Sequence, residues 1–135
     1  MPIQESLFRK VFDASSLINL KNNKKMNFLR KRKGEILIPE KVADELKRGS
    51  RNDPLHKYVN KYPEVVVNFQ NSEEDEYLII RRQIGIGDGE AAAITIAVQR
   101  DLPLVIDDIK GREKAKNHKI KTMSWQDFVT KEVGI

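Results

Sequence analysis

The stretch GDGEAAAITIAVQRDLPLVIDD, residues 87–108, places an apolar helix directly before an apolar strand. The middle of the helix, residues 91–98, is apolar on every side, which is typical of a helix buried in a protein core. The strand covers residues 104–106 and ends at a pair of acids. Both junctions therefore carry carboxylates, namely Asp88, Glu90, Asp107 and Asp108.

Carboxylates placed at the start of a buried helix and at the end of a buried strand are costly. They repel one another, and each loses part of its hydration. A divalent cation supplies the missing positive charge. The stretch thus predicts a metal site whose remaining ligands lie elsewhere in the chain, whereas Asp88 is explained more simply as an N-cap of the helix.

Outside this stretch, short apolar runs alternate with helical segments along the whole chain. Strands are expected at residues 7–12, 35–39, 64–69, 104–106 and 121–123. Helices are expected at residues 14–22, 24–33, 40–48, 54–61, 73–83, 88–100 and 110–117. Ser72 is expected to cap the helix at 73–83, and Ser124 and Asp127 are expected to cap a last helix near the end of the chain. This alternation predicts an α/β fold with a mostly parallel central sheet. A length of 135 residues predicts one domain covering residues 1–135.

Four acids attached to apolar elements form the candidate site. In open α/β sheets, ligands collect beyond the carboxyl ends of the strands, where Asp13 and Asp108 each follow a predicted strand. Glu90 lies near the start of the buried helix, where the helix dipole favours an anion. Glu45 borders the apolar face of the segment PEKVADEL, residues 39–46. We expect these carboxylates to meet in one crevice.

Each of these acids also has a purely structural explanation. Asp13 can serve as the N-cap of the helix that begins at Ala14, and Glu90 can interact with the dipole of its own helix. Glu45 fits a solvated helix face almost as well as a site. One member of the pair at 107 and 108 can cap the following helix, and we expect Asp108 rather than Asp107 to be the ligand.

Composition restricts the class of partner. The net charge is +5 and the pI is about 9.4, which favours polyanions such as nucleic acid. Basic residues are concentrated within residues 21–33, namely Lys21, Lys24, Lys25, Arg30, Lys31, Arg32 and Lys33. This basic run is either a solvated helix face or a guide for an RNA backbone.

The cysteine content and the hydropathy of the sequence bear on where in the cell the protein acts. The chain has no cysteine, so disulfides and thiolate metal sites are excluded. We expect a cytoplasmic protein without a signal peptide and without a membrane span, because no apolar run approaches the roughly 20 residues that a spanning helix needs.

The acidic motifs, taken in order, resemble those of the PIN domain family of metal-dependent ribonucleases. They are VFDASSLINL (11–20), ILIPEKVADELKRG (36–49), GDGEAAAITIA (87–97) and LPLVIDD (102–108). The resemblance is greatest to VapC-like toxins and covers residues 11–128. It implies a three-layer α/β/α fold with helices on both sides of the sheet. Ser15 resembles the hydroxyl residue that the family often has two positions after its first acid.

The resemblance also implies the chemistry. The catalytic acids would be Asp13, Glu45, Glu90 and Asp108, with Mg²⁺ or Mn²⁺ held by Asp13, Glu90 and Asp108 and with Asp107 and Glu45 as further candidate ligands. Hard cations prefer such oxygen ligands. A metal-bound water would attack the scissile phosphate of RNA and leave a 5′-phosphate.

The resemblance further implies a toxin of a type II toxin–antitoxin system, with a cognate antitoxin as a partner and with homodimerisation. Three other hypotheses stay open: an RNA-processing nuclease without an antitoxin, a non-catalytic RNA-binding relative, and a phosphoacceptor receiver-like domain. In the receiver-like domain the acidic pair normally ends the first strand, whereas here it ends a late one. The presence of all four acids argues against the non-catalytic relative.

Overall fold

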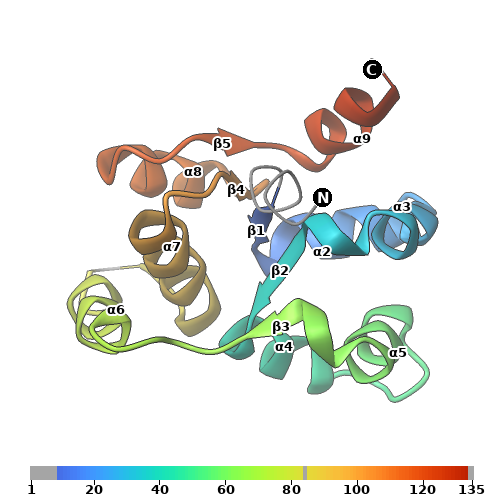
Figure 1. Cartoon of the computed structure of the whole chain (residues 1–135), viewed down its shortest axis with the longest axis horizontal. Coiled ribbons are helices and arrows are strands. Elements are labelled where there is room, and N and C mark those ends of the chain that lie inside the picture. The colour runs from blue at the N-terminus through green and yellow to red at the C-terminus, as the bar shows by residue number, and fades with distance from the viewer. Residues whose placement is uncertain (1–8, 84, 134–135) are drawn as a thin grey trace.

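A parallel sheet forms the centre of the computed structural model, which describes residues 9–83 and 85–133 (Figure 1). The order of the strands across the sheet is β3-β2-β1-β4-β5, and every neighbouring pair is parallel. The strands are β1 (Lys10–Phe12), β2 (Ile36–Pro39), β3 (Val66–Val67), β4 (Leu104–Val105) and β5 (Thr122–Met123). The mostly parallel sheet expected from the alternation of strands and helices is confirmed.

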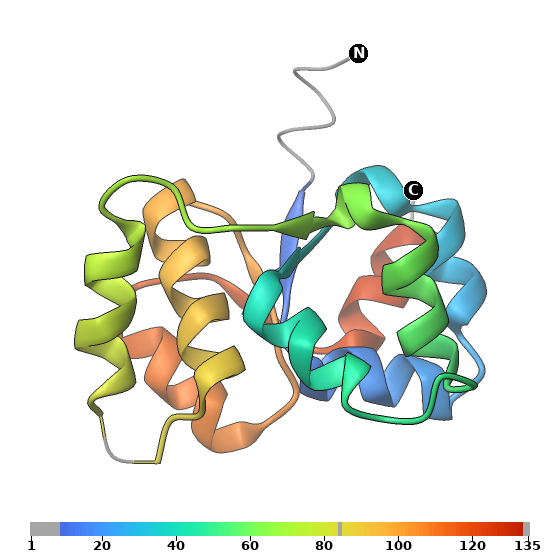
Figure 2. The same cartoon turned by 90° about the horizontal axis from the view of Figure 1, so that it is seen from below.

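Helices cover both faces of this sheet (Figures 1 and 2). Within the described residues they are α2 (Ala14–Asn22), α3 (Met26–Lys31), α4 (Glu40–Lys47), α5 (Pro54–Lys61), α6 (Glu73–Arg81), α7 (Asp88–Arg100), α8 (Ile109–Asn117) and α9 (Trp125–Val133). Short 3-10 turns precede β2 and β3, at Lys33–Glu35 and Pro63–Val65. No helix in this part of the chain is long and apolar enough to cross a membrane.

Two apolar cores lie on opposite faces of the sheet, because successive side chains of a strand point to opposite sides. Phe12 and Val105 pack into the core formed with α2, α3, α4, α5 and α9. Val11 and Leu104 pack into the core formed with α6, α7 and α8. The protein therefore has the three-layer α/β/α architecture of a PIN-like fold.

Helix α7 is buried as predicted. Its residues from Ala91 to Ala97 are all at most 1% exposed. Small alanine side chains let this helix approach the sheet, α4 and α6 closely. The helix ends at Asp101, whose backbone adopts the left-handed conformation with φ of 52°. The apolar stretch that predicts the fold is therefore the central helix of the second core.

The predicted strand at residues 64–69 was wrong in extent. Only Val66 and Val67 pair with β2, and Pro63–Val65 forms a 3-10 turn because proline fixes its own φ and favours a turn. After Val67 the chain leaves the sheet, where Arg100 Nη2 donates to the carbonyl oxygen of Asn68 at 2.8 Å. The first strand is also shorter than predicted: it begins at Lys10, and residues 7 and 8 lie outside the described part of the chain.

One predicted helix cap is wrong and another is confirmed. Ser72 has a helical backbone and makes no side-chain cap hydrogen bond. The carboxylate of Glu73, the first residue of α6, instead accepts from the amide of Gln70 and forms an ion pair with Arg100. At the start of α9, Ser124 and Asp127 cap each other reciprocally, as predicted.

The strand order places a topological switch point at β1. From β1 the sheet extends to β2 and β3 on one side and to β4 and β5 on the other. Ligands bind in α/β sheets beyond the carboxyl ends of strands at such a point. The register pairs Phe12 with Val105, and the amide of Asp13 donates to the carbonyl oxygen of Val105 at 3.0 Å. The residues that follow β1 and β4 therefore meet at one edge.

Candidate functional site

Asp13 lies at the carboxyl end of β1 and is the N-cap of α2. Its side chain is buried, with the residue only 6% exposed. Oδ2 accepts from the backbone amide of Ser15 at 3.3 Å and from the hydroxyl of Ser15 at 2.9 Å. Burial raises the pKa of Asp13 despite these hydrogen bonds, and the charge of Asp108 adds to the increase. A cap alone does not require a buried carboxylate with a raised pKa.

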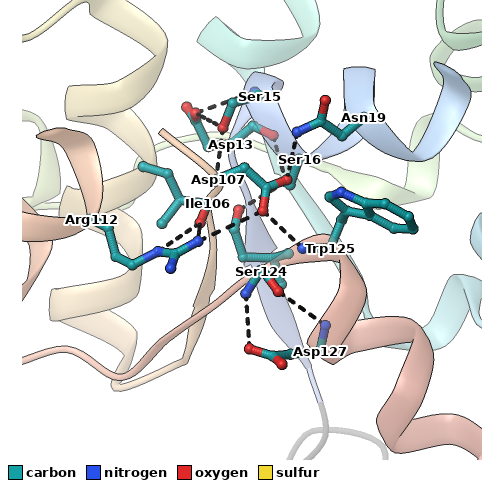
Figure 3. Close-up of polar contacts among 11 residues, drawn as sticks. Asp13, Ser15, Ser16, Asn19, Ile106, Asp107, Arg112, Ser124, Trp125 and Asp127 are labelled. Carbon is teal, nitrogen blue, oxygen red and sulfur yellow. Dashed lines mark hydrogen bonds and ion pairs between the residues drawn. The ribbon is translucent and has the colours of Figure 1, made fainter. Parts of the chain in front are cut away.

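Two serines fix the start of α2 against the ends of β1 and β4 (Figure 3). The hydroxyl of Ser15 donates to Asp13 and accepts from the amide of Asp107 at 3.1 Å. The hydroxyl of Ser16 lies 2.9 Å from the carbonyl oxygens of both Asp13 and Val105. These contacts orient the Asp13 carboxylate relative to the two acids that follow β4.

Glu90 and Asp108 converge on Gly111 of α8. Asp108 is the N-cap of α8, and its Oδ2 accepts from the amide of Gly111 at 3.0 Å. Glu90 Oε1 is buried and has no hydrogen-bond partner in the structure. A methyl group on Gly111 would lie 3.1 Å from Glu90 Oε1 and 3.2 Å from Asp108 Oδ2. Glycine at this position therefore leaves a small space that two carboxylates border.

Glu90 has a strongly perturbed carboxyl group. Its pKa is raised to about 7, first by burial and then by the charges of Asp13, Asp108 and Glu45, while the charge of Lys114 lowers it. The four predicted acids are therefore electrostatic neighbours. Such a group is typical of sites that bind cations or transfer protons.

Glu45 reaches the site from α4. Its Oε1 accepts from the amide of Gly89, in the first turn of α7, at 3.0 Å. Partial burial raises the pKa of Glu45; the bond from Gly89 lowers it, and the charge of Asp13 raises it again. A side chain that merely belonged to a solvated helix face would not be fixed to the start of a buried helix.

Asp107 contacts Asn19, Trp125 and Arg112 and stabilises the fold (Figure 3). Its Oδ2 accepts from Asn19 Nδ2 at 3.0 Å, and its Oδ1 accepts from the amide of Trp125 at 3.0 Å. Arg112 Nη2 lies 3.8 Å from the same Oδ1. Because both oxygens hold α2 and α9 in place, the structure favours Asp108 over Asp107 as the member of the pair that faces the site.

Asp88 forms an ion pair with Arg81 of α6, and its side chain is 52% exposed. The hydrogen bond from Arg81 lowers the pKa of Asp88, which is the opposite of what happens at Glu90. Its predicted role as N-cap is wrong, because Gly87 occupies the N-cap position and Asp88 is the first residue of α7. Asp88 thus belongs to the contact between α6 and α7.

The sequence did not reveal three residues that hold the site in place: Asn19, Gly111 and Arg112. Asn19 carried a usable signal, because it lies three and four residues after Ser16 and Ser15 in an otherwise apolar helix. Gly111 and Arg112 carried none, since both fit an ordinary polar helix. Their roles depend on where α8 begins relative to β4.

The acidic residues fit a hard divalent cation. Within the described residues, no three or more Asp, Glu or His side chains form a group that could hold a metal ion by themselves. Mg²⁺ does not require one, because it is usually held by one or two carboxylates, several waters and substrate phosphates. The unpartnered oxygen of Glu90 and the raised pKa values of Asp13 and Glu45 are the features that such a cation would relieve.

A parallel α/β sheet with an acidic cluster at its switch point defines a class of proteins that bind their ligands beyond the strand ends. Residues 9–124 match a family model described as PIN domain, so the chain belongs to the PIN domain family. Proteins of this family are generally metal-dependent nucleases. No curated protein matches the chain, so the family model and the structure carry the assignment.

The raised pKa of Glu90 predicts how stability depends on pH in the metal-free protein. In the unfolded chain the carboxyl has its ordinary pKa of 4.5, whereas in the folded protein its pKa is about 7. Between these values the folded state holds a proton that the unfolded state has lost. The free energy of unfolding therefore falls as pH rises from about 5 to about 7.

Glu90→Gln is expected to weaken this pH dependence and to raise Tm at pH 8, because it removes the buried charge. Thermal unfolding in EDTA at pH 5, 6, 7 and 8 measures both effects. Asp88→Asn, at an exposed position two residues earlier, serves as the control and should keep the wild-type pH dependence. Parallel pH curves for wild type and Glu90→Gln would show that Glu90 is not perturbed.

Proposed function

We propose that this protein is a metal-dependent endoribonuclease with Asp13, Glu45, Glu90 and Asp108 as its catalytic acids. One observation carries the proposal: near the switch point of the sheet, four carboxylates from four different segments interact electrostatically, and burial and their mutual charges raise the pKa values of three of them. Folds seldom keep such a costly arrangement for stability alone.

The acidic residues would bind the metal ion, and neighbouring residues would hold them in position. Asp13, Glu90 and Asp108 would hold Mg²⁺ or Mn²⁺, with Glu45 as a further candidate ligand from α4. When bound, the ion lowers the pKa of a coordinated water and neutralises charge on the phosphate. Ser15 and Gly111 position Asp13 and Asp108 through the hydrogen bonds described above. Glu90, whose Oε1 is buried without a hydrogen-bond partner and whose pKa is raised to about 7, would be stabilised in its ionised form by the cation.

The finer identity that we propose is that of a toxin of a type II toxin–antitoxin system, acting on cytoplasmic RNA as a homodimer and inhibited by a cognate antitoxin. Its support is the resemblance of the four motifs to VapC-like toxins. Induced expression should then arrest bacterial growth, and an Asp13→Asn variant should not. Growth unaffected by the active protein would favour the RNA-processing nuclease without an antitoxin.

The cleavage assay tests the proposed activity itself. With a labelled single-stranded RNA, purified protein should produce fragments that carry 5′-phosphates in Mg²⁺ or Mn²⁺ but none in EDTA. Adding excess Mg²⁺ after EDTA should restore cleavage. Cleavage that continues undiminished in EDTA would exclude the metal-dependent mechanism and point to a contaminating nuclease.

A further inference from the structure

A pocket lies between α3 and α5, away from the acidic cluster. It has a volume of about 330 Å³, within the range of small-ligand sites. Its wall includes Arg30, Asn52, Lys57, Tyr58, Lys61 and Tyr62. Figures 1 and 2 place α3 and α5 on the side of the sheet opposite α6, α7 and α8. We refer to it as the α3/α5 pocket.

No acidic residue lines the α3/α5 pocket to neutralise its positive charge. Three of its lining residues are cationic, and none is acidic. The nearest acids of the same elements are engaged elsewhere, because Asp53 pairs with Lys21 at 2.9 Å and Glu64 pairs with Lys33 at 2.7 Å. The pocket is therefore a concentration of positive charge that is open to an anion.

The pocket is built on a rigid frame. Tyr58 is 3% exposed, and its hydroxyl donates to the carbonyl oxygen of Leu29 at 2.7 Å, which fixes α5 to α3. Tyr62 packs on Tyr58 with ring centres 5.1 Å apart. Lys61 Nζ lies 5.5 Å and Lys33 Nζ 4.8 Å from the centre of the Tyr62 ring. The ring thus holds two ammonium groups near the pocket.

The arrangement on α5 is unfavourable without a ligand. Lys57 and Lys61 lie four residues apart and face the same side of the helix, and like charges at this spacing destabilise a helix. Arg30 brings a third charge from α3. A phosphate group between these side chains would remove the repulsion.

We propose that the α3/α5 pocket binds backbone phosphates of an RNA strand whose cleavage site lies in the acidic cluster. The proposal rests on the proposed ribonuclease function. Helix α2 connects the two places: it begins beside Asp13, and its nine residues span about 13 Å toward α3. The pocket would therefore contact the RNA away from the scissile bond. It contributes affinity without base recognition, since phosphate contacts position a strand.

The test measures binding rather than cleavage. The affinity of the full chain for a fluorescent 20-nucleotide oligouridine is measured in EDTA at several salt concentrations. The variant Lys57→Ala with Lys61→Ala is compared with a control of equal charge change, Lys116→Ala with Lys121→Ala, at exposed positions in α8 and directly before β5. Loss of two phosphate contacts should reduce the slope of log affinity against log salt by about 1.4.

The control should retain the wild-type slope, and equal slopes for the two variants would overturn the proposal. If the Lys57→Ala, Lys61→Ala variant loses binding to poly-glutamate but binds RNA as the wild type does, the proposal is also overturned, and the pocket then fits an acidic protein partner. Cleavage in Mg²⁺ is assayed in parallel to separate the two proposals. If the wild-type protein does not cleave RNA but the Lys57→Ala, Lys61→Ala variant has the reduced slope, the nuclease proposal is contradicted and phosphate binding by the pocket is supported. If the wild-type protein cleaves RNA but the variant keeps the wild-type slope, the nuclease proposal is supported and the pocket proposal is contradicted.

Discussion

Asp13→Asn is expected to reduce metal-dependent RNA cleavage by about 10³-fold or more while the protein stays folded. Asn removes the charge that would hold the cation but keeps an oxygen that can accept from Ser15, and Asn is as good an N-cap as Asp. Because burial raises the pKa of Asp13, the folded protein gains from losing this charge above neutral pH. Stability in EDTA at pH 8 should therefore be unchanged or higher.

The matched control is Asp127→Asn. Asp127 also accepts from a serine amide in the first turn of a helix, but it is exposed and belongs to α9. This variant should cleave at the wild-type rate and keep its stability within a few tenths of a kcal/mol, because Asn retains an oxygen that can accept from Ser124. Cleavage rates with Mn²⁺ and thermal melts of the three proteins measure both effects. An Asp13→Asn protein that cleaves normally would remove Asp13 from the catalytic acids.

The elements that the sequence predicts best are those whose pattern is set by burial alone. Helix α7 is apolar on all sides, and no competing explanation exists for such a run. The strand predicted at residues 64–69 failed because valine content reports burial rather than pairing. Val65 is fully buried, yet it lies in a 3-10 turn that follows Pro63. Hydrogen bonding at the edge of the sheet depends on neighbours far away in the sequence.

The candidate site was predictable in its residues but not in their division of labour. Asp107 and Asp108 are identical in type and adjacent, so only the register of β4 and the position of Asn19 separate them. Asp88 and Glu90 both lie in the first turn of α7, and they face different partners because α6 brings Arg81 to one of them. Partners that arrive through tertiary packing leave no local trace in the sequence.

Glu45 is the acid whose role most needs a test, and Gly89 provides one without touching the carboxylate itself. A methyl group on Gly89 would overlap Oε1 of Glu45 and approach its Cδ to 2.9 Å. Glu45 would have to turn away and lose its 3.0 Å hydrogen bond from the Gly89 amide. In a helix, however, alanine is favoured over glycine by about 1 kcal/mol.

Gly89→Ala is therefore expected to separate activity from stability. Cleavage should fall by about 10- to 100-fold, as when a group that orients a metal ligand is lost, while Tm should stay the same or fall only slightly because the helical gain offsets the displaced side chain. Gly87→Ala is the control, since a methyl group there meets nothing within 4 Å and its φ of −81° suits alanine. This control should keep its activity and lose a few tenths of a kcal/mol or more through its weaker N-cap.

A double variant decides whether the loss acts through Glu45. If Gly89→Ala works by displacing that carboxylate, then adding it to Glu45→Ala should lower the cleavage rate no further, because the two changes remove the same interaction. Independent, multiplicative losses would mean that the methyl group disturbs the start of α7, and with it Glu90, rather than Glu45. In that case the loss in Gly89→Ala would not report on Glu45. A Glu45→Ala protein that cleaves at the wild-type rate would show that Glu45 only caps α7, and the catalytic set would then be Asp13, Glu90 and Asp108.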